Sequence, residues 1–129
     1  MAKFCGVLLI LSMLVSVVIA DEKEPKGKAS SSGFEKRCGW LSNPTPSNWW
    51  LTDKDATWVI GAQGGYQVSD ESYDHLPQFP ENRTYWKKTN GFYGYGCACL
   101  RVKVDRKEER VLEIKSGQAL PLAKCLFVR

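Results

Sequence analysis

The clearest structural signal in this chain is Gly91-Phe-Tyr-Gly-Tyr-Gly-Cys-Ala-Cys-Leu-Arg-Val-Lys-Val-Asp105. From Cys97 onward the residue types alternate, with cysteines and charged side chains on one face and apolar side chains on the other. The first set is Cys97, Cys99, Arg101 and Lys103, and the second is Ala98, Leu100, Val102 and Val104. A period of two is that of a β-strand, so the pattern predicts a strand whose apolar face packs on a core.

A β-hairpin is predicted upstream of this strand. Its two strands are residues 48–52 and 57–61, and Asp53-Lys-Asp-Ala56 between them has the composition of a turn. Trp58 and Ile60 share one face of the second strand, which predicts that Trp58 is buried. Residues 66–68 are a candidate for a short third strand.

Downstream of the central strand, a charged turn leads into a predicted antiparallel strand over residues 110–115, which Gly117 is expected to end. We expect a loop or single turn at 118–123 and a closing strand at 125–128. Residues 69–90 have no sustained period and predict a long surface loop. No segment of about ten residues has the helical period. The predicted fold class is all-β, a small antiparallel sandwich or barrel of about six short strands.

The N-terminal part of the chain is typical of export. Lys3 precedes an apolar run that ends in Val18-Ile-Ala20, so residues 1–20 are predicted to be a signal peptide; an uncleaved membrane anchor is the alternative. Residues 21–37 are rich in Lys, Glu, Gly and Ser, which predicts a disordered linker. The folded domain is then 38–129. We expect it in the periplasm or outside the cell, with no stable membrane insertion after cleavage.

Four cysteines remain after this cleavage, namely Cys38, Cys97, Cys99 and Cys125. An even number in a small exported domain predicts two disulfides that staple the sheet. A bond between Cys97 and Cys99, two residues apart on one strand, would distort the backbone. Two pairings stay open: Cys38–Cys97 with Cys99–Cys125, or Cys38–Cys99 with Cys97–Cys125. Either one ties both ends of the domain to the central strand.

Composition and motifs argue against several classes of function. A formal net charge of +4 without a basic stripe does not indicate a nucleic-acid partner. His75 is the single histidine and has no neighbouring ligand or nucleophile, and Asp53 and Asp55 have the position of turn formers. We therefore expect no enzymatic activity, no cofactor and no metal. A metal or redox protein that uses Cys97 and Cys99 is a minor alternative.

A set of motifs spread over the domain carries a resemblance. The motifs are Cys38-Gly-Trp40, Asn43-Pro-Thr-Pro46, Asn48, Trp58-Val-Ile-Gly-Ala-Gln-Gly-Gly65, Tyr95-Gly-Cys-Ala-Cys99, Leu120-Pro-Leu122 and Cys125. In this combination the chain resembles a family of small exported bacterial proteins classed as a domain of unknown function. The resemblance implies a bacterial, exported, disulfide-bonded domain and no particular activity. It favours coincidence for the glycosylation pattern Asn82-Arg-Thr84.

The aromatic residues carry the remaining functional signal. Trp49 and Trp50 are neighbours on a predicted strand, so their side chains point to opposite faces. An exposed tryptophan suits a protein interface and also offers a flat surface to a sugar ring. We predict a non-enzymatic protein-binding module, of an inhibitor or immunity type, whose partner is another exported or cell-envelope protein. The alternative is a binder of glycan or peptidoglycan that uses Trp49 or Trp50 with Asn48 and Gln63.

Overall fold

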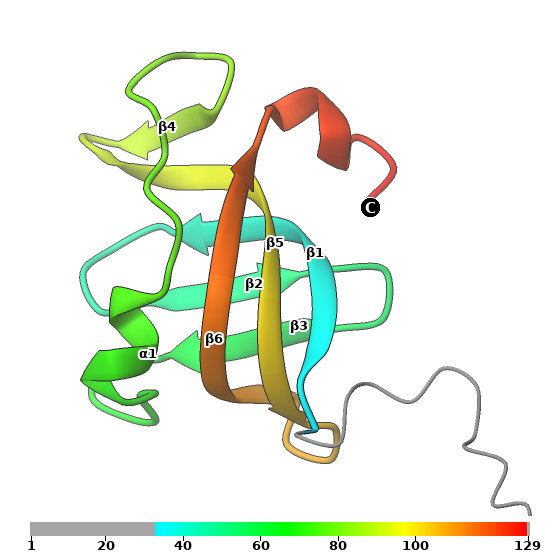
Figure 1. Ribbon diagram of the computed structural model, residues 1–129. Helices are drawn as coiled ribbons and strands as arrows, with labels where there is room; N and C mark the ends of the chain where they lie inside the picture. Colours follow the sequence, from blue (N-terminus) through cyan, green and yellow to red (C-terminus); the bar gives the residue numbers. More distant parts are fainter. Residues whose placement is uncertain (1–32, 129) are drawn as a thin grey trace, which may run out of the picture.

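The structure, a computed structural model, describes residues 33–128, and its strands form one strongly curved sheet (Figure 1). The strands are β1 (Glu35–Asn43), β2 (Trp49–Thr52), β3 (Thr57–Gly61), β4 (Trp86–Asn90), β5 (Tyr93–Asp105) and β6 (Arg110–Leu120). One helical turn, α1 (Asp70–Asp74), follows β3, and a 3-10 turn, η1 (Leu122–Cys125), follows β6. The predicted all-β class is confirmed. Neither helical turn in this described part of the chain is long enough to cross a membrane.

The sheet closes into a barrel because β5 also pairs with β1. Around the barrel the order is β1-β2-β3-β6-β5, and only the contact of β3 with β6 is parallel. That contact is a single register pair, Val59 with Arg110, beside which the Val59 N–H donates to the Glu109 carbonyl at 3.0 Å. β4 lies outside this circuit and pairs with β5. A small, partly open five-stranded barrel is the architecture of the OB-fold, which by itself assigns no function.

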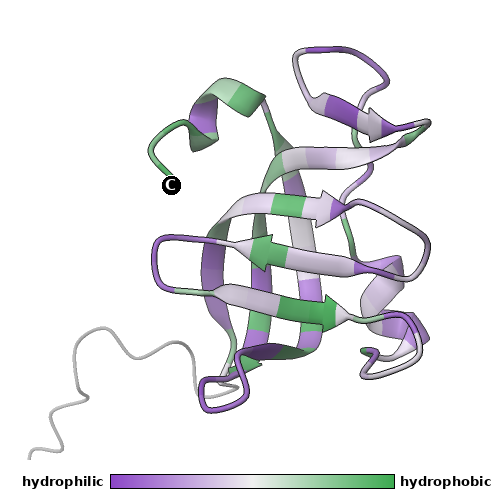
Figure 2. Ribbon diagram, turned by 180° about the vertical axis from the view of Figure 1, so that it is seen from behind, coloured by the Kyte–Doolittle hydropathy of each residue, from purple (hydrophilic) through white to green (hydrophobic). Residues whose placement is uncertain are grey.

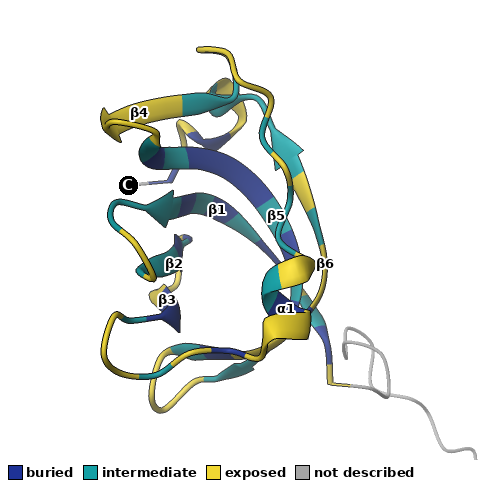
Figure 3. Ribbon diagram, turned by 90° about the vertical axis from the view of Figure 1, so that its left-hand side faces the viewer, coloured by how far each residue is buried: buried dark blue, intermediate teal, exposed yellow. Residues whose placement is uncertain are grey.

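The barrel interior is built from alternate residues of the strands, as the pattern in β5 predicts. Ala98, Leu100 and Val102 are buried in the core, and Figure 3 shows β5 buried along much of its length. The other buried core residues are Leu41, Leu51, Trp58, Ile60, Val68, Val111 and Ile114. Trp58 is only 3% exposed, which confirms its predicted burial.

Both disulfides lie on the outer face of the barrel, on the side of β5 that faces away from this core. Cys38 bonds to Cys99 directly across the β1–β5 pair, and Cys97 bonds to Cys125 in η1. The structure therefore selects the second of the two pairings that the sequence leaves open. A second small core forms around the Cys97–Cys125 bond, made of Cys97, Cys125 and Val128 with Trp40 and Leu120 packed against them. Figure 2 shows apolar residues in this C-terminal turn as well as on the barrel strands.

A buried ion pair joins the start of β1 to the turn between β2 and β3. Arg37 Nη1 donates to Asp53 Oδ2 at 2.7 Å, and the guanidinium lies 4.1 Å from the centroid of the Trp58 ring. Burial by itself would raise the pKa of Asp53, but hydrogen bonds from Arg37, Ala56 and Asp55 outweigh it, so the pKa is lowered. Asp53 Oδ1 accepts the N–H groups of Asp55 and Ala56 at 2.8 and 3.0 Å, which confirms its role as a turn former.

The ordered domain begins earlier than the sequence predicts. β1 starts at Glu35 and Phe34 is buried, so the stretch up to Arg37 is not a disordered linker at its C-terminal end. Composition misleads here because residues 35–37 gain their order from pairing with residues 100–102 of β5, far away in the sequence. The predicted signal peptide, residues 1–20, and the rest of the predicted linker up to residue 32 lie outside the described residues.

Four predicted segments near the C-terminus and around the long loop also need correction. β6 continues through Gly117, where the missing side chain leaves room for Pro77 and Leu100 to pack. Residues 125–128 belong to η1 and the turn after it, not to a closing strand. The predicted surface loop over residues 69–90 contains α1 and β4, and the candidate strand at 66–68 is reduced to one bridge between Gly61 and Gln67.

Removing the cross-strand disulfide should destabilise the barrel. The two cysteines are 61 residues apart, for which the chain-entropy model gives about 4 kcal/mol of stabilisation. We expect Cys38→Ala/Cys99→Ala to lose about that free energy of unfolding in urea titrations and to keep the Cys97–Cys125 bond. A non-reducing peptide map of the wild type should recover Cys38 linked to Cys99. A peptide linking Cys38 to Cys97 would contradict this pairing.

The ion pair should make stability sensitive to acid. A carboxylate with a lowered pKa contributes stability that is complete above its ordinary pKa of about 4 and is lost as the pH falls through the lowered value. Asp53→Asn keeps the turn-forming oxygen but leaves Arg37 without its closest partner, so we expect a loss of about 3 kcal/mol at pH 7. The loss should shrink below pH 4. The control Asp55→Asn, at the more exposed partner of Arg37, should cost less than about 1 kcal/mol.

Candidate functional site

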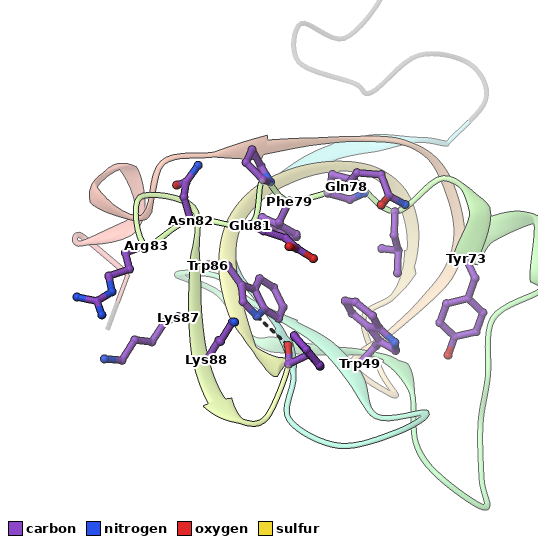
Figure 4. Close-up of a pocket in the computed structure, with 14 residues that line it drawn as sticks. Trp49, Tyr73, Gln78, Phe79, Glu81, Asn82, Arg83, Trp86, Lys87 and Lys88 are labelled. Atoms are coloured by element: carbon purple, nitrogen blue, oxygen red, sulfur yellow. Dashed lines mark hydrogen bonds between the residues drawn. The ribbon is translucent and has the colours of Figure 1, made fainter.

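A groove of about 1220 Å³ lies between β4 and the start of β2 (Figure 4). One wall is the segment 76–83, which connects α1 to β4, and the other wall includes Trp49 and Tyr73. Figure 1 shows this connecting segment running from α1 up to β4, alongside β6. The groove therefore exists only in the folded barrel, because its walls come from elements far apart in the sequence.

The connecting segment is held to the barrel at several points, so the groove has a defined shape. The Ile114 N–H donates to Ser72 Oγ at 3.0 Å, and His75 Nδ1 lies 2.7 Å from the Ile114 carbonyl oxygen. Further along, the Phe79 ring packs directly on Gly96, where a Cβ atom would overlap it. Near β4, the Leu122 N–H donates to the Thr84 carbonyl at 2.8 Å. Backbone and side-chain contacts thus fix both ends of this wall.

Aromatic side chains from five separate segments converge on the groove. They are Trp49 of β2, Tyr73 of α1, Phe79 of the connecting segment, Trp86 of β4 and Phe92 of the β4–β5 turn. The Phe79 and Trp86 ring centroids are 4.9 Å apart, and Trp86 Nε1 donates to the Phe92 carbonyl at 3.0 Å. Phe92 itself is 81% exposed. An exposed phenylalanine beside a packed aromatic cluster is apolar surface that a ligand can cover.

Tyr73 contributes its hydroxyl as well as its ring. Burial raises the pKa of Tyr73, and the charge of Tyr66 adds to the effect, so the phenol is protonated at neutral pH. Its O–H donates to Gln67 Oε1. Since this bond holds the ring in place, Tyr73 acts as a fixed side of the groove and not as a titrating group.

The rim of the groove is rich in positive charge. Arg83, Lys87 and Lys88 line it together with one carboxylate, Glu81. Figure 4 shows Arg83 and Lys87 projecting outward beside β4, while Lys88 lies nearer the rings. Lys88 Nζ is 5.0 Å from the Phe92 ring centroid. The ion pairs found among residues 33–128 involve other cations: Arg37, Lys103 and Arg106.

The residues predicted for binding do not share one surface. Trp49 lines the groove, whereas Trp50 is not part of its lining. Asn48 is a structural residue: its Nδ2 donates to Thr45 Oγ1 at 2.6 Å, and its Oδ1 accepts the Gln63 backbone N–H at 2.8 Å. Gln63 is exposed at the turn after β3. Of the four residues predicted for binding, the structure thus places Trp49 in the groove and Trp50, Asn48 and Gln63 outside its lining.

The sequence prediction misses most of the groove. Phe79, Trp86 and Phe92 carry no local pattern that separates them from ordinary loop aromatics, because only the closure of the barrel brings them together. The one local signal is the pair Lys87-Lys88 directly after Tyr85-Trp86, a basic and aromatic cluster in an otherwise acidic segment. Such a cluster can be noticed in a sequence, but the sequence does not show which of its side chains are buried or which groove residues they contact.

The cysteines do not form a second site. Cys97 and Cys99 bond to different partners, so they are not a Cys-x-Cys pair with each other. Within residues 33–128 no three His, Cys, Asp or Glu side chains gather in a way suited to a metal ion.

Comparison with known proteins gives one match. Residues 32–127 match the model of a family described as "Protein of unknown function (DUF4087)". The match covers the whole barrel and begins just before β1, in agreement with the early start of the ordered domain. No curated protein and no solved structure matches the chain.

Proposed function

The chain belongs to the DUF4087 family, which has no assigned activity, and we propose that it is an exported, non-enzymatic protein that binds another exported or cell-envelope protein through the aromatic groove. The observation that carries this proposal is the convergence of five aromatic side chains on one groove, with Phe92 left 81% exposed. Aromatic anchors surrounded by a charged rim are typical of protein interfaces.

The chemistry of the groove supports binding more than catalysis. Its lining contains a single carboxylate, Glu81, and no histidine, cysteine, serine or aspartate. General acid–base or nucleophilic catalysis commonly pairs a nucleophile with a base at hydrogen-bond distance, and no hydrogen bond or ion pair joins Glu81 to Tyr73, Lys87 or Lys88 in the described part of the chain. Lysine and arginine side chains on the rim can attract or orient a ligand. The aromatic side chains and the cationic rim therefore both suit binding, whereas neither of them by itself suits catalysis.

Export is supported by the disulfides. Two disulfides tie β1 and η1 to β5, and such bonds form and persist in oxidising compartments such as the periplasm or the extracellular space. The apolar run at residues 4–20 would direct the chain to the secretion machinery, because it has the length and flanking residues of a cleaved signal peptide.

A cell-wall glycan is the second candidate, because Trp49 and Trp86 offer ring faces in the groove. Sugar hydroxyls also need free amide or carboxylate partners. Asn48 is expected in that role, but its amide nitrogen donates to Thr45 and its amide oxygen accepts the Gln63 backbone N–H. The groove lining has other polar side chains, Gln78, Glu81 and Asn82, so a glycan stays the second candidate. Protein binding is preferred because of the exposed Phe92 side chain and the cationic rim.

Truncating the exposed Phe92 side chain should weaken partner binding and leave the fold stable. We expect immobilised wild-type protein to capture a partner from an envelope extract, identified by mass spectrometry, and Phe92→Ala to lose it through a weakening of about 2 kcal/mol. Leu112→Ala removes another exposed apolar side chain outside the groove and should capture the partner normally. Equal capture by all three proteins, or sedimentation of the wild type with purified cell wall alone, would contradict the proposal.

Export predicts a defined N-terminus. Protein purified from its native host should begin at Asp21, because cleavage after Val18-Ile-Ala20 satisfies the small-residue rule for signal peptidase. Intact-mass measurement under non-reducing conditions should also show no free thiol in the processed chain. Recovery of residues 1–20 in the membrane fraction would mean that the segment is an anchor.

A further inference from the structure

We infer that the groove and the free edge of β4 form one docking site for an extended acidic peptide segment, which adds to the sheet as a further strand beside β4. This inference rests on the proposed function and names the chemistry of the partner. Extended peptides commonly bind proteins by adding to an exposed strand edge, where the main chain gives affinity and alternate side chains enter pockets.

The strand edge is open over residues 87–90, whereas the Trp86 N–H already donates to the Asn82 carbonyl at 3.1 Å. β4 is the last strand in the sheet order and pairs with β5 alone, so its other side has no strand neighbour among the described residues. Lys87, Lys88, Thr89 and Asn90 are all exposed. An edge strand leaves N–H and C=O groups that point away from the sheet, and these are the groups to which an incoming strand can bond.

The groove is continuous with this edge. Trp86, the first residue of β4, packs against Phe79 inside the groove, and Phe92 follows the strand at its other end. Neighbouring residues of a strand point to opposite faces, so Lys87 lies on the face of β4 away from Trp86. A peptide paired with β4 would place alternate side chains over the aromatic groove and the others beside Lys87.

Charge selects the partner. Three cations, Arg83, Lys87 and Lys88, line the groove against one carboxylate, Glu81. Lysines on a strand edge repel a second copy of the same edge and thereby disfavour self-association. Lys87, on the face away from Trp86, attracts carboxylates across the new strand pair, while Lys88 lies over the Phe92 ring beside the groove. The occupant that fits is a strand in which apolar residues alternate with Asp or Glu.

The test uses random peptides of about eight residues, the upper range of a strand, displayed on phage and selected against the immobilised processed protein. We expect the selected peptides to alternate apolar and acidic residues. Synthetic copies should bind Lys87→Glu/Lys88→Glu about tenfold more weakly than wild type, because the attraction at Lys87 becomes a repulsion and the change at Lys88 puts a carboxylate beside the apolar side chains of the peptide. The control Lys54→Glu/Lys107→Glu reverses two exposed lysines in other turns and should bind as wild type does.

The backbone contact has its own test. Methylating every second peptide nitrogen removes half of the main-chain donors and leaves the side chains unchanged. We expect one phase of methylation to abolish binding and the other phase to have little effect, because only alternate N–H groups of a strand face its neighbour. Failure to select any peptide, selection of peptides without acidic residues, or equal tolerance of both phases overturns the inference.

Failure of the inference can be distinguished from failure of the proposed function. A partner that depends on Phe92 but binds Lys87→Glu/Lys88→Glu at full strength would leave the groove as a protein-binding site and remove the acidic strand. If the selected peptides bind Phe92→Ala and the wild type with equal affinity, peptides bind the strand edge without the aromatic groove. That result would contradict the proposed function. Dimer formation by the isolated protein through β4, seen by sedimentation, would replace the peptide by a second copy of the chain.

Discussion

The rest of the structure depends on β5, which forms hydrogen-bonded pairs with three other strands. β1 pairs along one side from Gly94 to Val102, while β4 and then β6 pair along the other. A strand held on both sides cannot slip by one residue without moving its core side chains to the outer face. The two disulfides from Cys97 and Cys99 fix the same register covalently, because a slip would carry both sulfur atoms into the core.

The groove follows from the way in which β5 changes neighbours. β6 pairs with β5 from Asp105 back to Cys97, and β4 takes over from Gly96 to Tyr93. Two strands that meet end to end beside a third leave a gap between them, and the segment 76–83 must cross it to enter β4. The missing side chain at Gly96 lets Phe79 fill that crossing point. The aromatic cluster is thus built where β5 exchanges β6 for β4 as its neighbour.

Local alternation in the sequence is enough to predict β2, β3 and β5, because each has a face that the barrel buries. It fails for residues 35–37, whose Lys, Glu and Arg side chains are typical of linkers; Arg37 is buried only because Asp53 and Trp58 receive it. Glycine often marks the end of a strand, but β6 continues through Gly117. The space that a side chain would take there is filled by Pro77 and Leu100. In the groove only Trp49 can be predicted, since Phe79, Trp86 and Phe92 meet through pairing over long separations.

The distribution of charge separates the part of the domain that holds the fold from the part that we propose as the binding surface. Arg37 is only 8% exposed and contacts two aspartates, and its pKa is raised because these hydrogen bonds outweigh the lowering effect of burial. Such a pair is costly to break, because removing one partner leaves a buried charge without compensation. Lys87 and Lys88 are exposed on the edge strand, where charges contribute little to folding. Folding stability therefore does not account for two adjacent lysines beside an aromatic groove: their charge disfavours self-association of the strand edge and, in the proposal above, attracts an acidic partner.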